Sequence, residues 1–222
     1  MQKFDTPAPV SAVLDIPAGR IRFIAADRAD TTVEVLPADA SKARDVKAAE
    51  RITVVYGDGV LRIGAPAANN RILGNSGSVE VTVQLPAGSR IEAKTASAEF
   101  QGVGRLGDVT FEGAHGTVKL DETESASLTL LAGDVSVGRL GGPAQISTQK
   151  GDIHITEAMH GTVTLRTEHG EISIDAARGV SASLDAGTGY GRIHNALRNT
   201  EGTAALNIHA TTAYGDITAR SL

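Results

Sequence analysis

Short runs in the second half of the chain alternate strictly between aliphatic and polar residues. Isoleucines at positions 153 and 155 flank His154, isoleucines at 172 and 174 flank Ser173, and valines at 135 and 137 flank Ser136. Successive side chains of a β-strand point to opposite faces, so this alternation places the aliphatic residues on one face. The pattern predicts short β-strands with one buried and one exposed face.

The same unit recurs along the chain. It opens on a small residue followed by an alternating strand, as in GDVSV, GDIHI and GEISI, and the opening residues are Ala98, Gly116, Gly133, Gly151, Gly170, Gly191 and Gly215. An apolar residue lies five positions before most of them, so each unit carries two short strands. Strands this short bury their aliphatic face only when unit stacks on unit.

The repeats therefore predict an all-β fold, a parallel β-solenoid (right-handed β-helix) of about six to seven short coils. Adjacent coils would lie about 4.8 Å apart, with the opening glycine supplying the positive φ of each corner. A β-sandwich or an antiparallel meander also alternates and is also punctuated by glycine. Hairpins do not need the same residue order in every unit, so the solenoid is favoured.

Residues 1–93 follow a different pattern and are predicted to form an N-terminal β-rich capping region with one short helix. The solenoid repeats then occupy residues 94–222. Strand-like runs in the capping region lie at residues 10–16, 19–25 and 32–37. Such a region would cover the unpaired edge and the open apolar core of the first coil.

Three further elements are expected within the capping region. Residues 40–50 favour a helix, with Asp39 as its N-cap. A hairpin is expected to turn at Gly57-Asp58-Gly59, and a polar loop is expected at residues 68–78.

Composition narrows the class of protein. The net charge is -5 with acids and bases interspersed, and no basic face is evident for nucleic acid. The chain has no Cys, which removes disulfides, thiolate metal sites and thiol catalysis. The opening residues lack a signal-peptide pattern, and no run of 18 apolar residues occurs. We therefore expect a soluble, cytoplasmic protein without a membrane span.

Three stretches resemble a bacterial protein family. They are the serial G-D-[VI]-x-[VI] units, the opening FDTPAPVSAVLDIPAGRIRFIAADRADTTVEV and the link VEVTVQLPAGSRIEAKTASAEF. Over essentially the whole chain they resemble the family of domain of unknown function 4097 (DUF4097), which is labelled "putative adhesin". The resemblance implies a β-solenoid fold and no established catalytic residues.

One column of side chains is a candidate for chemistry. The residues that follow successive opening glycines would stack, which places Asp134, Asp152 and Glu171 about 5 Å apart. Such carboxylates are a weak candidate for a divalent-cation site, and their spacing also resembles that of a retaining glycosidase pair. The favoured interpretation is structural, with each acid bonding a backbone N–H. We expect no cofactor and no catalytic residue.

Tyr190 and Tyr214 each precede the opening glycine of their unit. On stacked coils the two rings would lie one above the other. We expect a surface stack that stabilises the C-terminal coils.

The favoured function is a non-enzymatic β-solenoid scaffold or an adhesin-like binding module, for a protein or cell-surface partner that the sequence does not identify. A self-assembling β-helix protein is the alternative, and a β-helix glycan hydrolase or lyase is the least favoured class. After Ile217 only five residues remain, too few to cover a parallel edge. We therefore expect partner docking or weak self-association through the C-terminal coil, at Gly215, Asp216 and Ile217.

Overall fold

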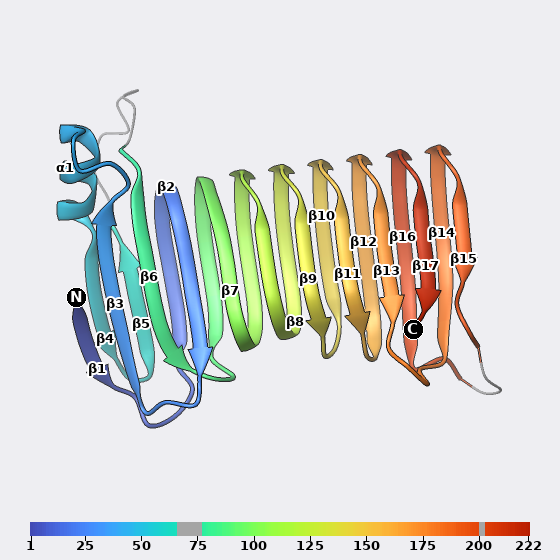
Figure 1. The fold of residues 1–222 in the computed structure, drawn as a ribbon, viewed down its shortest axis with the longest axis horizontal. Coiled ribbons are helices and arrows are strands. Elements are labelled where there is room, and N and C mark those ends of the chain that lie inside the picture. The colour runs from blue at the N-terminus through green and yellow to red at the C-terminus, as the bar shows by residue number, and fades with distance from the viewer. Residues whose placement is uncertain (66–76, 200–202) are drawn as a thin grey trace. The chain divides into compact units, whose positions relative to one another are not determined.

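The structure is a computed structural model of the 222-residue chain, and it describes residues 1–65, 77–199 and 203–222 (Figure 1). These residues form β-strands and one short helix, and they divide into two compact units, Met1–His115 and Gly116–Leu222. The fold is all-β, as the sequence predicts. Most strand pairs are parallel, which is consistent with a β-solenoid.

The first unit combines parallel and antiparallel strands. Its elements are β1 (Gln2–Asp5), β2 (Ser11–Ala26), β3 (Asp30–Pro37), α1 (Ala43–Arg51), β4 (Thr53–Gly57), β5 (Val60–Gly64), β6 (Val79–Pro86) and β7 (Arg90–His115). Strand β2 pairs in parallel with β7 on one edge and with β5 and β6 on the other. The pairs β3–β6, β1–β3 and β4–β5 are antiparallel. The expected boundary between residues 93 and 94 lies inside β7, and the division into a capping region and a repeat region stays a prediction.

Strand β2 has the same corner as the repeats, although the sequence predicts two separate runs here. Gly19 has a φ of 147°, and a Cβ at this position would lie 1.8 Å from the carbonyl oxygen of Val79. No side chain fits so close to a neighbouring backbone, so glycine is required. Gly19 also lies opposite Ala98, the first opening residue of the repeats. Residues 11–26 therefore form a rung of the repeat kind that lacks the G-D signature.

The helix begins later than the sequence predicts, and Asp39 is not its N-cap. The N-cap of α1 is Lys42, which makes no side-chain capping bond. Asp39 Oδ1 instead accepts the Ser41 N–H at 2.9 Å and the Ser41 hydroxyl at 2.6 Å, because a short Asp side chain readily bonds the next turn of backbone. The Ser41 hydroxyl and Lys42 lower the pKa of Asp39 from 3.8 to about 2.

The predicted hairpin is confirmed. Strands β4 and β5 pair antiparallel and turn at Asp58 and Gly59, which have φ values of 51° and 75°. Two successive positive φ angles are typical of the type I′ turn that an Asp-Gly pair favours. Of the polar loop expected at residues 68–78, residues 68–76 lie outside the described residues.

The second unit is entirely parallel in its strand pairing. Its strands are β8 (Val118–Ala132), β9 (Val135–Leu140), β10 (Ala144–Lys150), β11 (Ile153–Ala158), β12 (Gly161–His169), β13 (Ile172–Ala176), β14 (Ala182–Tyr190), β15 (Ile193–Ala196), β16 (Leu206–Tyr214) and β17 (Ile217–Ser221). One ladder runs in the order β8, β10, β12, β16, β14. The other runs in the order β8, β9, β11, β13, β17, β15.

The alternation predicted from the sequence gives a continuous aliphatic core. The isoleucines at 153, 155, 172 and 174 are buried as expected, and so are Val163 and Leu165 of the neighbouring strand β12. In the register of the ladder, Ile153 lies opposite both Val135 and Ile172. Parallel stacking in register therefore places like residue on like residue, and the polar residues between them face outwards.

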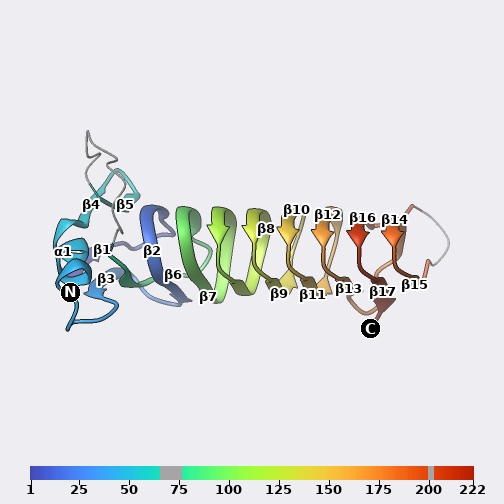
Figure 2. The same cartoon turned by 90° about the horizontal axis from the view of Figure 1, so that it is seen from above.

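The coils at the C-terminus do not stack in the order of the sequence. The coil of β16 and β17 lies between the coil of β12 and β13 and the coil of β14 and β15 (Figures 1 and 2). The prediction of sequential stacking is wrong at this point. The segments from Gly170 to Gly191 and from Gly191 to Gly215 are the longest between opening residues of the repeats. They are long enough for the chain to pass over one coil position and then return to fill it.

Candidate functional site

The predicted carboxylate column lies at the corners of the second unit and bonds the backbone. Asp134 Oδ1 accepts the backbone N–H of Asp152 at 2.9 Å, and Asp152 Oδ1 accepts that of Glu171 at 2.8 Å. Asp216 Oδ1 accepts the N–H of Arg192 in the same way, at 2.8 Å. Within the described ranges, no three His, Asp or Glu side chains are grouped so that they could hold a metal ion. The observed bonds support the structural interpretation of the column.

A buried threonine also supports these corners, and the sequence-based predictions do not include this role. Thr167 Oγ1 donates to the carbonyl of Gly151 at 3.0 Å, and Thr212 Oγ1 donates to that of Gly170 at 3.1 Å. The motif from which this role could be predicted is T-x-x-G, which recurs as TQKG, TEHG, TGYG and TAYG. The buried threonine hydroxyl finds its hydrogen-bond partner in the carbonyl of the corner glycine, so this motif is structural as well.

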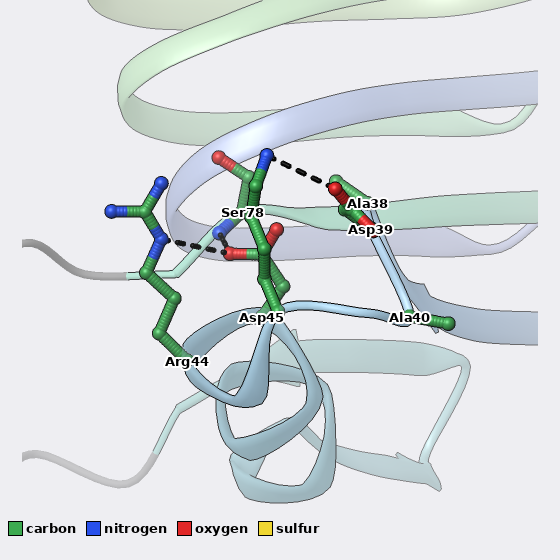
Figure 3. A pocket seen from close by; sticks show the side chains of 7 residues that line it. Ala38, Asp39, Ala40, Arg44, Asp45 and Ser78 are labelled. Atoms are coloured by element: carbon green, nitrogen blue, oxygen red, sulfur yellow. Dashed lines mark hydrogen bonds and ion pairs between the residues drawn. The ribbon is translucent and has the colours of Figure 1, made fainter.

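A polar hollow lies where α1 begins, with a volume of about 770 Å³ (Figure 3). Its lining consists of Ala38, Asp39, Ala40, Lys42, Arg44, Asp45 and Ser78. The buried carboxylate of Asp45 accepts the backbone N–H of Ser78 at 3.0 Å, and Asp39 forms an ion pair of 3.0 Å with Lys42. The charged groups of the hollow pair with one another and hold the start of the helix in place.

The residues expected at the C-terminal edge lie inside the stack. Ile217 pairs with Ile172 on one side and with Ile193 on the other, and it is fully buried. The N–H of Gly215 donates to the carbonyl of Tyr190 at 2.9 Å. The prediction of a free edge at Ile217 is therefore wrong, because the β14–β15 coil covers the last strand of the chain.

An ion pair fixes the last strand against β13. Arg220 donates to both carboxylate oxygens of Asp175, at 2.8 and 2.7 Å, and this bidentate bond raises the pKa of Arg220 above its usual value. Asp175 is almost completely buried. A buried carboxylate needs such a partner, so β17 is an integral part of the unit.

The open edge of the second unit is formed by β14 and β15, and we call these two strands the terminal edge. In the described part of the chain, β14 pairs with β16 alone and β15 with β17 alone. At the start of β14, the Ala182 N–H also donates to the carbonyl of Arg198 at 3.3 Å. Ile193 is 46% exposed, whereas Ile172 and Ile217 in the same column are buried. The end of the aliphatic core is thus accessible here.

A stack of aromatic rings runs to the terminal edge. The ring centroids of His169 and Tyr214 are 4.9 Å apart and those of Tyr214 and Tyr190 are 5.0 Å apart, with interplanar angles of 9° and 3°. The tyrosine stack predicted from the sequence is confirmed, and it includes His169. Tyr190 is the outermost ring and is 71% exposed.

The parallel coils, buried aliphatic columns and corner glycines define a β-solenoid-like protein. A family model described as Toastrack DUF4097 matches residues 13–221, and the chain belongs to this family. No curated protein matches the sequence of the chain. Over the described ranges, none of the helical structure is long and apolar enough to cross a membrane.

Solved structures of bacterial proteins are similar to the chain at low sequence identity. A "putative adhesin" from Bacteroides fragilis is 13% identical, with a TM-score of 0.46, and the match covers 98% of this chain and 95% of that one. A "putative adhesin" from Parabacteroides distasonis is 16% identical, with a TM-score of 0.48 and the same coverage. A "putative lipid binding protein" from Parabacteroides distasonis is 12% identical, with a TM-score of 0.43 and the same coverage.

Proposed function

We propose that the chain is a non-enzymatic β-solenoid scaffold that binds a protein partner through the terminal edge. The observation that carries this proposal is the asymmetry of pairing in the second unit. Among the described residues, strands β9 to β13, β16 and β17 are paired on both sides, whereas β14 and β15 are paired on one side. A parallel edge with accessible N–H and C=O groups is a template for another strand.

Exposed side chains support the same location. Large apolar residues are exposed on the terminal edge at Tyr190 and Ile193, on the adjacent strand β16 at Tyr214, and directly after β17 at Leu222. Large apolar residues that gather on one surface mark interaction sites more often than scattered ones do.

The antiparallel strands of the first unit support a capping role. Strand β3 pairs antiparallel with β6, β1 pairs antiparallel with β3, and α1 lies against β3. In our proposal these elements close the end of the parallel ladder in that unit, and the coils wind in the right-handed sense that parallel crossovers favour.

A binding role is favoured over glycan hydrolysis or lysis. The acids whose spacing resembles a glycosidase pair, Asp134 and Asp152, each accept a backbone N–H. Self-assembly is the second candidate function, since end-to-end contact of two copies would use the same open edge.

The proposal can be tested by site-specific photocrosslinking of the full chain in its native cell. A photoreactive phenylalanine replaces Ile193 at the terminal edge, and the matched control carries it at Thr164, an exposed residue on the outer face of β12. We expect a crosslink to a different protein from position 193 and not from position 164. Crosslinks to other copies alone would favour self-assembly, and the absence of any crosslink from position 193 would contradict the proposal.

A further inference from the structure

The side of the terminal edge that pairs with β16 and β17, its inner side, indicates which kind of strand could pair with the outer side. There β14 and β15 pair in parallel with β16 and β17, with Leu184 opposite Ile208, Tyr190 opposite Tyr214 and Ile193 opposite Ile217. Both sides of a parallel strand carry the same ladder of N–H and C=O groups. A strand added to the outer side would extend the same columns of side chains by one step of about 4.8 Å.

Tyr190 sets the first requirement for such a strand. Its inner face stacks on Tyr214 at a centroid distance of 5.0 Å, and its ring is 71% exposed. The spacing of the stack equals the spacing of the strands, so a residue at the next step of this column would meet the outer face of the ring. An aromatic residue at that position would continue the stack and bury Tyr190.

Arg192 sets the second requirement. In the corner column it stands where other coils carry Asp134, Asp152 or Asp216, and its side chain is 91% exposed. Asp216 accepts the Arg192 N–H and also forms an ion pair of 3.8 Å with the Arg192 guanidinium, but Arg192 has no carboxylate to offer the next strand. It offers a guanidinium, which pairs best with a carboxylate.

The coil that forms the terminal edge is basic in a chain whose net charge is -5, since residues 178–199 hold three Arg and one Asp. Arg178 and Arg198 are exposed before β14 and after β15, while the exposed Asp185 is bonded to His209 at 3.3 Å. Two copies that met edge to edge would bring two such basic surfaces together, and like charges would oppose that contact. Charge complementarity therefore favours an acidic partner over a second copy.

We propose that the outer side of β14 and β15 binds an extended segment of an acidic protein as an added parallel strand. The segment carries an aromatic residue over Tyr190, a carboxylate over Arg192 and an aliphatic residue over Ile193. Main-chain bonds provide the general affinity and these three side chains provide the specificity. This inference rests on the proposed function and adds the chemistry of the partner to it.

The test uses a blocked peptide, LNIHATTAYGDITA, which has the sequence of residues 206–219 and meets all three requirements. We expect it to bind the full chain and to slow hydrogen exchange at the amides of β14 and β15. Replacing the Asp of the peptide by Lys should weaken binding about fivefold, the size of an exposed ion pair. The variant Arg192→Glu should reverse this preference, so that the Lys peptide binds better than the Asp peptide.

A second variant separates addition at the outer side from displacement of the chain's own β16 and β17. Ser173 and Thr218 are register partners on β13 and β17, and the chain has no cysteine. The double substitution Ser173→Cys and Thr218→Cys would lock β17 in place through a disulfide. Unchanged peptide binding in the locked protein supports addition to the outer side, and loss of binding would overturn the inference.

Other outcomes separate this inference from the proposed function. A crosslink from position 193 combined with no peptide binding would overturn the added-strand chemistry and leave the proposed function standing. A concentration-dependent dimer that Arg192→Glu strengthens would show that the occupant is a second copy, which would also overturn the acidic partner. If no crosslink forms from position 193 and the peptide does not bind, both the proposed function and this inference are overturned.

Discussion

At the scale of single residues, the corners of the coils are fixed by steric contact between backbones. A Cβ at Gly170 would lie 2.0 Å from the carbonyl oxygen of Gly151, and a Cβ at Gly133 would lie 1.5 Å from that of Gly116. The neighbouring atom is backbone in each case, so it cannot move away without separating the coils. Glycine recurs in the sequence chiefly because adjacent corners touch.

We predict that Gly170→Ala lowers the free energy of unfolding by about 2 kcal/mol or more, because the added methyl group overlaps a backbone carbonyl. The matched control is Gly187→Ala, where a Cβ would meet no atom within 4 Å. Denaturant unfolding of both variants and the parent measures the difference. Equal stability of the two variants would show that the corners are less tightly packed than the structure indicates.

Asp30 carries a charge whose contribution to stability depends on pH. The side chains of Arg28 and Lys3 bond it at 2.9 Å each and lower its pKa from 3.8 to about 2. Since the folded pKa lies below the unfolded one, folding favours the ionised form. The stabilisation is complete above about pH 4 and is lost as the pH falls towards 2.

We therefore expect Asp30→Asn to be less stable than the parent at neutral pH and equally stable near pH 2. Urea unfolding of both proteins at several pH values between 2 and 7 measures the gap in free energy. A gap that stays constant across this range would mean that the charge of Asp30 makes no contribution.

At the scale of the strands, the structure depends on alternation between buried and exposed residues. Ile153 is 1% exposed and lies opposite Val135 and Ile172, while the adjacent His154 faces outwards. A shift of register by one residue would exchange the two faces. The aliphatic columns therefore define the register of the whole ladder.

Replacing Ile153 by Asp should lower the free energy of unfolding by about 3 kcal/mol or more, because it buries a carboxylate without a partner. His154→Asp places the same charge one residue away, on the exposed face, and should have little effect. Thermal or denaturant unfolding of the pair measures this contrast. If Ile153→Asp melted cooperatively at the parent temperature, the register would have to be revised.

Much of the local structure could be predicted because it depends on neighbours in the sequence. The Ile153-His154-Ile155 pattern gives the strand and its buried face, and Asp58-Gly59 gives the turn between β4 and β5. The N-cap role that the sequence predicts for Asp39 is wrong because Asp suits both an N-cap and a turn, and only the path of the backbone decides between them. The Thr167 corner bond was missed because threonine on a strand usually needs no special partner.

At the scale of the whole molecule, the order of the coils determines which surface is open. Gly191 and Gly215 open units with nearly the same pattern, GYGRI and AYGDI. By this pattern, either of the two coils could stack on the coil of β12 and β13. The sequence predicts the open edge at Ile217 because that strand comes last in the chain. The structure places the open edge at Ile193, and this change moves the candidate binding site by one coil.

Native-state hydrogen exchange, resolved by residue, tests the position of the last strand most directly. In a strand paired on both sides every amide is hydrogen-bonded, whereas in an edge strand every second amide faces solvent. We predict uniformly slow exchange at residues 217–219 of β17, and fast exchange at alternate amides of residues 193–196 of β15. Fast exchange at alternate amides of β17 together with uniform protection of β15 would contradict the inserted position of the C-terminal coil and the terminal edge derived from it.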